Sequence, residues 1–382
     1  LRVVRCGVRL ALLPKQLTQR APDLPLLGHV RRALQGQLQM LPRRTGTPQP
    51  LEQLGSLEDP EALARVTVSQ AARKLAVEVQ LQVPDPVPRQ QAPGRLRVAV
   101  AESVPTCPLA SLSVDEPLAG TAVESVDRWL LLEVNDLWAP KALQSEALSG
   151  SVRARLAEWL TVPRSRLQLV RRPGRSGRRS LFMVVSSDGR AQRVELDSLE
   201  DLAALHLDSV PHENLEPLVL VCAHGRRDRC CAQFGSAMYR ALQSRIGDLW
   251  QTSHLGGHRF AACVLSLPDG LMYGRMRPEH ADDFVASLHA GELGELDRFR
   301  GRTEYDRPTQ AAEIFVRRAT DFRASHGLEW LGTDDEGEWT WTVRFREGSR
   351  EHSIRVLRED MGLVRPASCG ADPEPVFRFV AG

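Results

Sequence analysis

The chain carries two cysteines and two histidines whose types and spacing suit metal binding. Cys222 and Cys231 are separated by eight residues, and His254 and His258 flank the tripeptide Leu-Gly-Gly. Thiolate sulfur and imidazole nitrogen are side-chain atoms that bind zinc and iron–sulfur clusters in proteins. The four residues are therefore candidate ligands of one metal centre. The alternative without metal chemistry is a set of ordinary buried thiols and hydrogen-bonded histidines.

Three kinds of site could use these residues. A structural zinc site normally has about two to four residues between its cysteines, fewer than this chain has. A reductase of the thioredoxin type needs a Cys-x-x-Cys motif, which is absent, and the neighbours Cys230 and Cys231 could form only a strained disulfide. An iron–sulfur cluster tolerates wide spacing, and two cysteines with two histidines suit a [2Fe–2S] cluster.

A strand and a helix are expected to position the two cysteines. The apolar run at 216–221 predicts a buried strand, and Cys222 follows it directly, where a strand leads into a loop. Helical spacing then begins, because one helical face would hold Cys231, Phe234, Met238 and Leu242. In the first turn of this helix, the positive end of the helix dipole would favour the thiolate of the cysteine.

The intervening loops supply further residues around the proposed centre. Asp228 is a suitable N-cap for the helix. Gly256 and Gly257 argue against a helix between the histidines and predict a tight loop, whose N–H groups could donate hydrogen bonds to sulfur. Arg226 would add positive charge that stabilises a reduced centre and attracts an acidic partner. The alternative for Arg226 is an exposed side chain in a solvated loop.

The wider pattern predicts an α/β protein with four segments. Residues 1–103 form a variable N-terminal extension of unknown role, and residues 104–212 form an α/β module. Residues 213–300 have the order strand, helix, irregular strand, hairpin, helix, which is the order of a thioredoxin-like unit. Residues 301–382 add a C-terminal helix and a hairpin. No internal repeat of fixed period is present.

Composition excludes several classes of protein. The chain has 382 residues, a net charge of +2 and 42% hydrophobic residues, and its apolar runs are far shorter than the ~20 residues that span a bilayer. Only three of its 50 basic residues are lysines, so arginine clusters reflect composition and do not indicate nucleic-acid binding. The odd number of cysteines, seven, and the large spacings between most of them do not resemble a secreted disulfide framework. We expect a cytoplasmic protein that binds neither nucleic acid nor membrane.

Two segments of the sequence resemble a known family. CAHGRRDRCCAQFG, followed by WQTSHLGGHRFAACVLSLPDGLMYGRM, is similar to the sucrase/ferredoxin-like family of thioredoxin-like ferredoxins with bis-histidinyl ligation. The resemblance runs from about Cys107 to Ser368–Gly370. It implies a [2Fe–2S] cluster in which Cys222 and Cys231 bind one iron and His254 and His258 bind the other. The gap between Cys231 and His254 is short for the family, so the intervening elements must be compact.

These observations together predict an electron carrier whose one-electron chemistry is coupled to protonation of the histidines. Its partner would be a redox protein or a small redox molecule. No carboxylate pair supports the hydrolase activity in the family name. The alternatives are a zinc-stabilised thioredoxin-fold binding module, or a thiol-based reductase that uses Cys230 or Cys231. Cys230 is expected to face away from the ligands, Cys263 to lie in the hairpin core, and Cys107 and Cys369 have no partner visible in the sequence.

Overall fold

The computed structural model describes residues 65–71, 74–80, 107–174, 179–366 and 372–382. The chain divides into two units, Leu1–Leu96 and Arg97–Gly382. The described part of the first unit is an antiparallel hairpin of β1 (Arg65–Ala71) and β2 (Lys74–Gln80). The rest of the predicted N-terminal extension lies outside the described residues.

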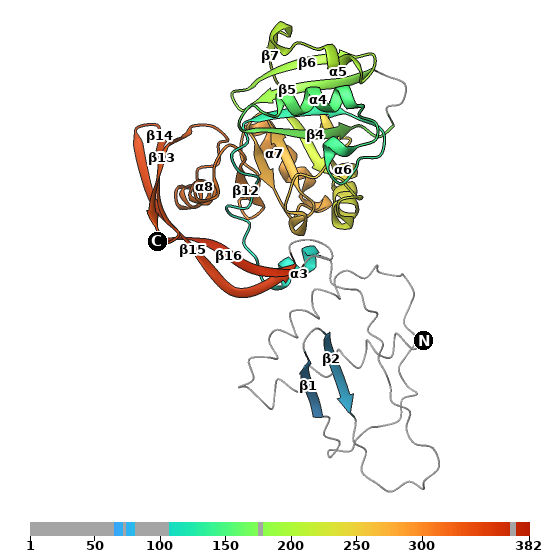
Figure 1. Ribbon diagram of the computed structural model, residues 1–382. Coiled ribbons are helices and arrows are strands. Elements are labelled where there is room, and N and C mark those ends of the chain that lie inside the picture. Colours follow the sequence, from blue (N-terminus) through green and yellow to red (C-terminus); the bar gives the residue numbers. More distant parts are fainter. Residues whose placement is uncertain (1–64, 72–73, 81–106, 175–178, 367–371) are drawn as a thin grey trace, which may run out of the picture. The chain divides into compact units, whose positions relative to one another are not determined.

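A mixed ten-stranded sheet forms the centre of the second unit (Figure 1). Its spatial order is β12-β11-β10-β8-β9-β4-β3-β5-β6-β7. The strands are β3 (Arg128–Glu133), β4 (Ser165–Arg171), β5 (Ser180–Ser186), β6 (Arg190–Leu196), β7 (His212–Asn214), β8 (Leu218–Cys222), β9 (Leu249–Thr252), β10 (Val264–Leu267), β11 (Leu271–Tyr273) and β12 (Phe299–Arg302).

The helices and short helical turns connect these strands. They are α3 (Cys107–Ser113), η1 (Ala142–Gln144), α4 (Gly150–Trp159), α5 (Asp201–Ala204), η2 (Leu207–Ser209), η3 (Cys231–Gly235), α6 (Ser236–Leu242), η4 (His258–Phe260), η5 (Pro278–His280) and α7 (Ala281–Ala290). Helix α4 begins at Gly150 because the Ser149 side chain caps it by accepting a hydrogen bond from the Val152 N–H group.

Strands β8 to β11 have the topology of a thioredoxin fold. Strands β8 and β9 are parallel and are joined through α6, whereas β10 pairs antiparallel with β8, and β11 pairs antiparallel with β10. Helix α7 follows β11. The predicted α/β fold with a thioredoxin-like unit is confirmed, since this is the predicted order of strand, helix, strand, hairpin and helix.

The preceding module repeats the same topology, although no repeat of fixed period is present in the sequence. Strands β3 and β4 are parallel around α4, β5 pairs antiparallel with β3, β6 pairs antiparallel with β5, and α5 follows. The two halves join through β4 and β9, which are antiparallel, with Val170 opposite Thr252 and Arg171 opposite Gln251. The central sheet therefore consists of two thioredoxin-like halves with an approximate two-fold axis at this junction.

The alternation of apolar residues in the strands builds a core on each face of the sheet. Side chains of β3, β4 and β5 pack against α4 and α5, and those of β8 to β11 pack against α6 and α7. On the other face, one core runs across both halves and contains Trp129, Trp250, Cys222 and Cys231. The junction between the halves is thus a packed interior.

The C-terminal extension contains α8 (Arg307–Thr320) and an antiparallel sheet. Its strands are β13 (Leu328–Gly337), β14 (Thr340–Glu347), β15 (Arg350–Pro366) and β16 (Pro373–Ala381). Helix α8 is followed by the hairpin of β14 and β15, and β13 and β16 extend this hairpin to four strands. Over the described residues, no helix is long and apolar enough to cross a membrane.

Candidate metal centre

Three of the four predicted ligands converge where β8 and β9 end. The Sγ atoms of Cys222 and Cys231 and a ring nitrogen of His254 all lie within 4.8 Å of one another. Cys222 is the last residue of β8, Cys231 opens the helical turn η3, and His254 lies just beyond β9. Because β8 and β9 are parallel, their carboxyl ends meet at one edge of the sheet and bring these side chains together.

Cys222 and Cys231 are both buried, and their side chains form a hydrogen bond with each other. The hydrogen bond from Cys231 lowers the pKa of Cys222, burial opposes this effect, and hydrogen bonding to His254 supports it. The same contact with Cys222, together with burial, raises the pKa of Cys231. The contact between the two sulfur atoms thus favours the thiolate at Cys222 and the thiol at Cys231, and a bound cation would replace the proton of the thiol.

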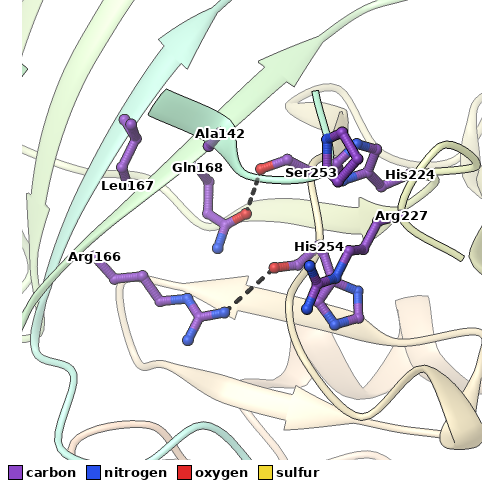
Figure 2. A pocket seen from close by; sticks show the side chains of 9 residues that line it. Ala142, Arg166, Leu167, Gln168, His224, Arg227, Ser253 and His254 are labelled. Carbon is purple, nitrogen blue, oxygen red and sulfur yellow. Dashed lines mark hydrogen bonds between the residues drawn. The ribbon is translucent and has the colours of Figure 1, made fainter. Parts of the chain in front are cut away.

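His254 lies at the boundary between this buried group and a cavity. Its Nδ1 lies 3.8 Å from Cys231 Sγ, and the side chain is only partly buried. His254 also lines a cavity of about 250 Å³, together with residues of both thioredoxin-like halves (Figure 2). The imidazole can thus face the sulfur atoms on one side and the cavity on the other.

His258 lies beside His254 but belongs to a second group of potential ligands. The ring centroids of the two histidines are 5.4 Å apart. The donor atoms of His258, Cys107 and Asp228 all lie within 4.8 Å of one another, and all three residues are buried. The Nε2 atom of His258 is 3.5 Å from Asp228 Oδ2. A carboxylate in this position is the usual partner of a metal-binding histidine, since it orients the ring.

Asp228 connects this second group to the start of the helix. Its Oδ1 accepts a hydrogen bond of 2.9 Å from the Cys230 N–H group, and helical conformation begins at Arg229. This agrees with the N-cap expected from the sequence. One carboxylate therefore holds the helix that carries Cys231 and also faces His258.

The glycines between the histidines have the backbone geometry that the sequence predicts. Gly256 and Gly257 have φ values of +100° and +67°, which disfavour other residues. A Cβ atom on Gly257 would lie 2.3 Å from Arg300 Nη2. The buried Arg300 guanidinium donates to the Gly256 carbonyl and to Cys263 Sγ, at 3.1 and 3.4 Å. Burial lowers the pKa of Arg300 to about 10.

Another glycine lets the helix approach Cys222. Gly235 ends the π-helical turn η3, and a Cβ atom there would lie 1.8 Å from the Cys222 carbonyl oxygen. Only a residue without a side chain leaves room for the helix against the strand end. This close approach places Cys231 beside Cys222.

The remaining cysteines in the described residues surround the candidate ligands. Cys230 is buried with Cys107 and Ala261, away from the group that contains Cys231. Cys263 donates to the Gly257 carbonyl at 3.4 Å, and burial raises its pKa to about 11. Cys369 lies outside the described residues, and Arg226 is exposed on its loop.

A buried ion-pair network ties the C-terminal sheet to this region. Arg365 of β15 donates to both carboxylate oxygens of Glu116, at 3.0 and 2.8 Å. Arg259, next to His258, donates to the same carboxylate at 2.8 Å. Burial alone would raise the pKa of Glu116, but the hydrogen bonds from Arg365 and Arg259 lower it. The extension therefore supports the loop that carries the histidines.

Several of these residues could not be identified from the sequence. Cys107, Glu116 and Arg300 reach the site from elements far from the ligand motif, and nothing in their own spacing marks them. Gly235 falls within a helical pattern, and nothing in the sequence around it indicates that it must pack against the end of a strand.

Three comparisons relate this chain to known proteins. The model of the family described as "Sucrase/ferredoxin-like" matches residues 118–301. "Altered inheritance of mitochondria protein 32" of Meyerozyma guilliermondii is 25% identical in an alignment of 118 residues that covers 28% of this chain and 42% of that protein. The chain thus spans less than half the length of this curated relative.

Among solved structures, a cysteine-to-serine variant of the thioredoxin-like [2Fe–2S] ferredoxin from Aquifex aeolicus is similar. It is 19% identical with a TM-score of 0.21, and the match covers 23% of this chain and 100% of that one. The matched family segment contains strands β3 to β11 and all four predicted ligands. The family match over residues 118–301 confirms the resemblance to the sucrase/ferredoxin-like family that the sequence predicts.

Proposed function

We propose that the protein is an electron carrier that holds a [2Fe–2S] cluster through Cys222, Cys231, His254 and His258. The observation that carries the proposal is the convergence of two buried cysteines and a histidine, with donor atoms within 4.8 Å of one another. The family match over residues 118–301 supports it. The second histidine lies beside the first, with ring centroids 5.4 Å apart.

The donor set fits such a cluster. Sulfur atoms from a strand end and a helix start face an imidazole, and the pKa of Cys222 is lowered, which favours the thiolate that iron requires. A bound [2Fe–2S] cluster would supply reversible one-electron transfer. Two thiolates and two neutral imidazoles contribute less negative charge than four thiolates, so we expect a potential above the ~−400 mV of plant-type ferredoxins.

The histidines would couple electron transfer to proton transfer. His254 faces Cys231 through Nδ1 and lines a cavity, so its other nitrogen can exchange a proton there. His258 has the Asp228 carboxylate 3.5 Å from Nε2. With one proton taken up per electron, the midpoint potential would fall by about 59 mV per pH unit. Protein-film voltammetry measures this slope, and a potential independent of pH would contradict the coupling.

Metal and sulfide analysis tests the proposal. Protein purified without oxygen is expected to be brown, with equal amounts of iron and acid-labile sulfide and visible bands bleached by dithionite. Cys222→Ser and Cys231→Ser should each lose the iron, because each removes a thiolate. Cys230→Ser is the matched control, since this buried neighbour belongs to neither group of potential ligands.

Zinc is the alternative occupant, since the same atoms suit it. A colourless protein with one zinc per chain and no sulfide would replace the electron-transfer proposal with a structural metal site. Iron loss in Cys230→Ser with retention in Cys231→Ser would shift the ligand assignment by one residue.

We further propose a cytoplasmic location and a redox protein or small redox molecule as the partner.

A further inference from the structure

Arg300 of β12 is a buried cation without a carboxylate partner. The residue is only 2% exposed. Its guanidinium donates to neutral acceptors, which are the Thr121 hydroxyl at 3.1 Å, the Thr121 carbonyl, the Gly256 carbonyl at 3.1 Å and Cys263 Sγ at 3.4 Å. No carboxylate of the described residues lies within ion-pair distance of it. Arginine is almost never this deeply buried unless it is paired, so the charge requires an explanation.

The buried carboxylate that acts on Arg300 from a greater distance is already paired. This carboxylate is Glu116, which accepts hydrogen bonds from Arg365 at 3.0 and 2.8 Å and from Arg259 at 2.8 Å. Burial lowers the pKa of Arg300 to about 10, so the guanidinium keeps its charge at neutral pH. Glu116 therefore does not compensate the positive charge of Arg300.

The Arg300 charge lies directly behind the candidate ligands. Cys263, which accepts from Arg300 through Sγ, also accepts a backbone hydrogen bond of 3.0 Å from the Cys222 N–H group. The side chains of Cys222, Cys231 and Cys263 pack in one core. The Gly256 carbonyl, which also accepts from Arg300, belongs to the loop between the two candidate histidines. One guanidinium thus contacts both the cysteine side and the histidine side of the centre.

We infer that Arg300 is a buried charge that raises the reduction potential of the metal centre. This inference rests on the proposed function. Two thiolates balance the charge of an oxidised [2Fe–2S] core, so one added electron leaves a net negative charge near Arg300. Water and salt screen a buried charge weakly, so the attraction favours the reduced form. The charges of Arg259 and Arg365 contribute less, because Glu116 offsets them.

Thr121 allows the charge of Arg300 to be compensated while the arginine stays in place. Its side chain is half-buried and its hydroxyl accepts from Arg300 Nε, so Thr121→Asp would put a carboxylate beside the guanidinium. Protein-film voltammetry of the full-length, iron-loaded protein is done at a pH below the proton-coupled range. We expect Thr121→Asp to favour the oxidised form at least about tenfold, a decrease of about 59 mV in potential. Thr121→Asn adds no charge and should keep the wild-type potential.

Two arginine variants separate the effect of buried charge from that of exposed charge. Arg300→Gln should lower the potential by a similar amount, and the decrease should persist at high ionic strength, because salt screens a buried charge far less than an exposed one. Arg226→Gln removes the same charge from an exposed position on the ligand loop. Its effect on the potential should be several-fold smaller and should vanish at high ionic strength.

Iron and acid-labile sulfide measured on the same samples distinguish the possible outcomes. Wild-type protein without iron would refute the proposed function, and this inference with it. Iron-loaded Thr121→Asp with the potential of Thr121→Asn would overturn the inference alone, and so would iron-loaded Arg300→Gln with the wild-type potential. If Arg300→Gln loses its iron, the comparison of the two Thr121 variants decides.

Discussion

Gly257 is a residue at which backbone geometry and the packing of the site can be tested separately. Its φ of +67° costs a residue with a side chain about 1–2 kcal/mol, and a Cβ atom would also clash with Arg300 Nη2 at 2.3 Å. Gly257→Ala is therefore expected to lower the free energy of unfolding by more than this amount and to reduce iron content. Denaturant unfolding and metal analysis measure the two effects.

Gly291→Ala is the matched control for this prediction. Gly291 has nearly the same φ, +66°, but no atom lies within 4 Å of its Cβ position. The free energy of unfolding of Gly291→Ala should fall only by the cost of the positive φ, about 1–2 kcal/mol, and the variant should keep its iron. Equal destabilisation by the two variants would show that the contact with Arg300 contributes nothing.

The ligand motif could be predicted from the sequence because its chemistry is local. The cysteines follow a strand and open a helix, and glycines separate the histidines, so the sequence marked all four residues as candidate ligands of one centre. Spacing could not show that His258 faces Asp228 and Cys107, because that contact depends on how α3 packs against the loop.

The long C-terminal strand β15 stabilises the site through one buried side chain. Arg365→Met would leave Glu116, which is only 2% exposed, without its bidentate partner. Breaking a buried ion pair by removing one partner costs about 3 kcal/mol. We expect that loss in the free energy of unfolding, together with a mobile histidine loop, because Arg259 shares the same carboxylate.

Arg378→Met serves as the comparison within the same sheet. Arg378 of β16 pairs with Glu359 of β15, and both side chains are nearly half exposed. Such surface pairs contribute at most about 1 kcal/mol. If Arg365→Met were no more destabilising than Arg378→Met, the C-terminal sheet would have no part in supporting the site.

Individual strands were easier to predict than their pairing. The apolar run at 216–221 identified β8, and helical periodicity identified the helix that begins near Cys231. The tight glycine loop continues into the helical turn η4, which ends at Phe260, and the next strand, β10, begins only at Val264. Pairing of β4 with β9 joins strands far apart in the sequence, and no local pattern encodes such a register.

The second unit consists of two thioredoxin-like halves that contribute different residues to the site. Cys222, Cys231, His254 and His258 all belong to the second half, whereas the first half contributes Arg166 and Leu167 to the cavity beside His254. The shared sheet holds both sets of residues in a fixed relation. A single half could supply the ligands but not both walls of the cavity.

A shortened chain that begins at Arg97 tests whether the second unit is sufficient for the metal centre. All candidate ligands lie in the unit Arg97–Gly382. We therefore expect the shortened protein to contain as much iron per chain as the full-length protein, measured by colorimetric iron analysis. A soluble product without iron would show that residues before Arg97 contribute to the site.

Electron–nuclear double resonance of the dithionite-reduced protein, labelled with ¹⁵N-histidine, tests the ligand assignment most directly. The proposed centre predicts hyperfine couplings from two histidine nitrogens, reduced to one in His254→Cys or His258→Cys. The wild-type spectrum alone is decisive if no histidine nitrogen couples to the unpaired electron. That result would contradict ligation by His254 and His258. It would leave either a cluster bound by cysteines alone or a redox-inactive metal such as zinc.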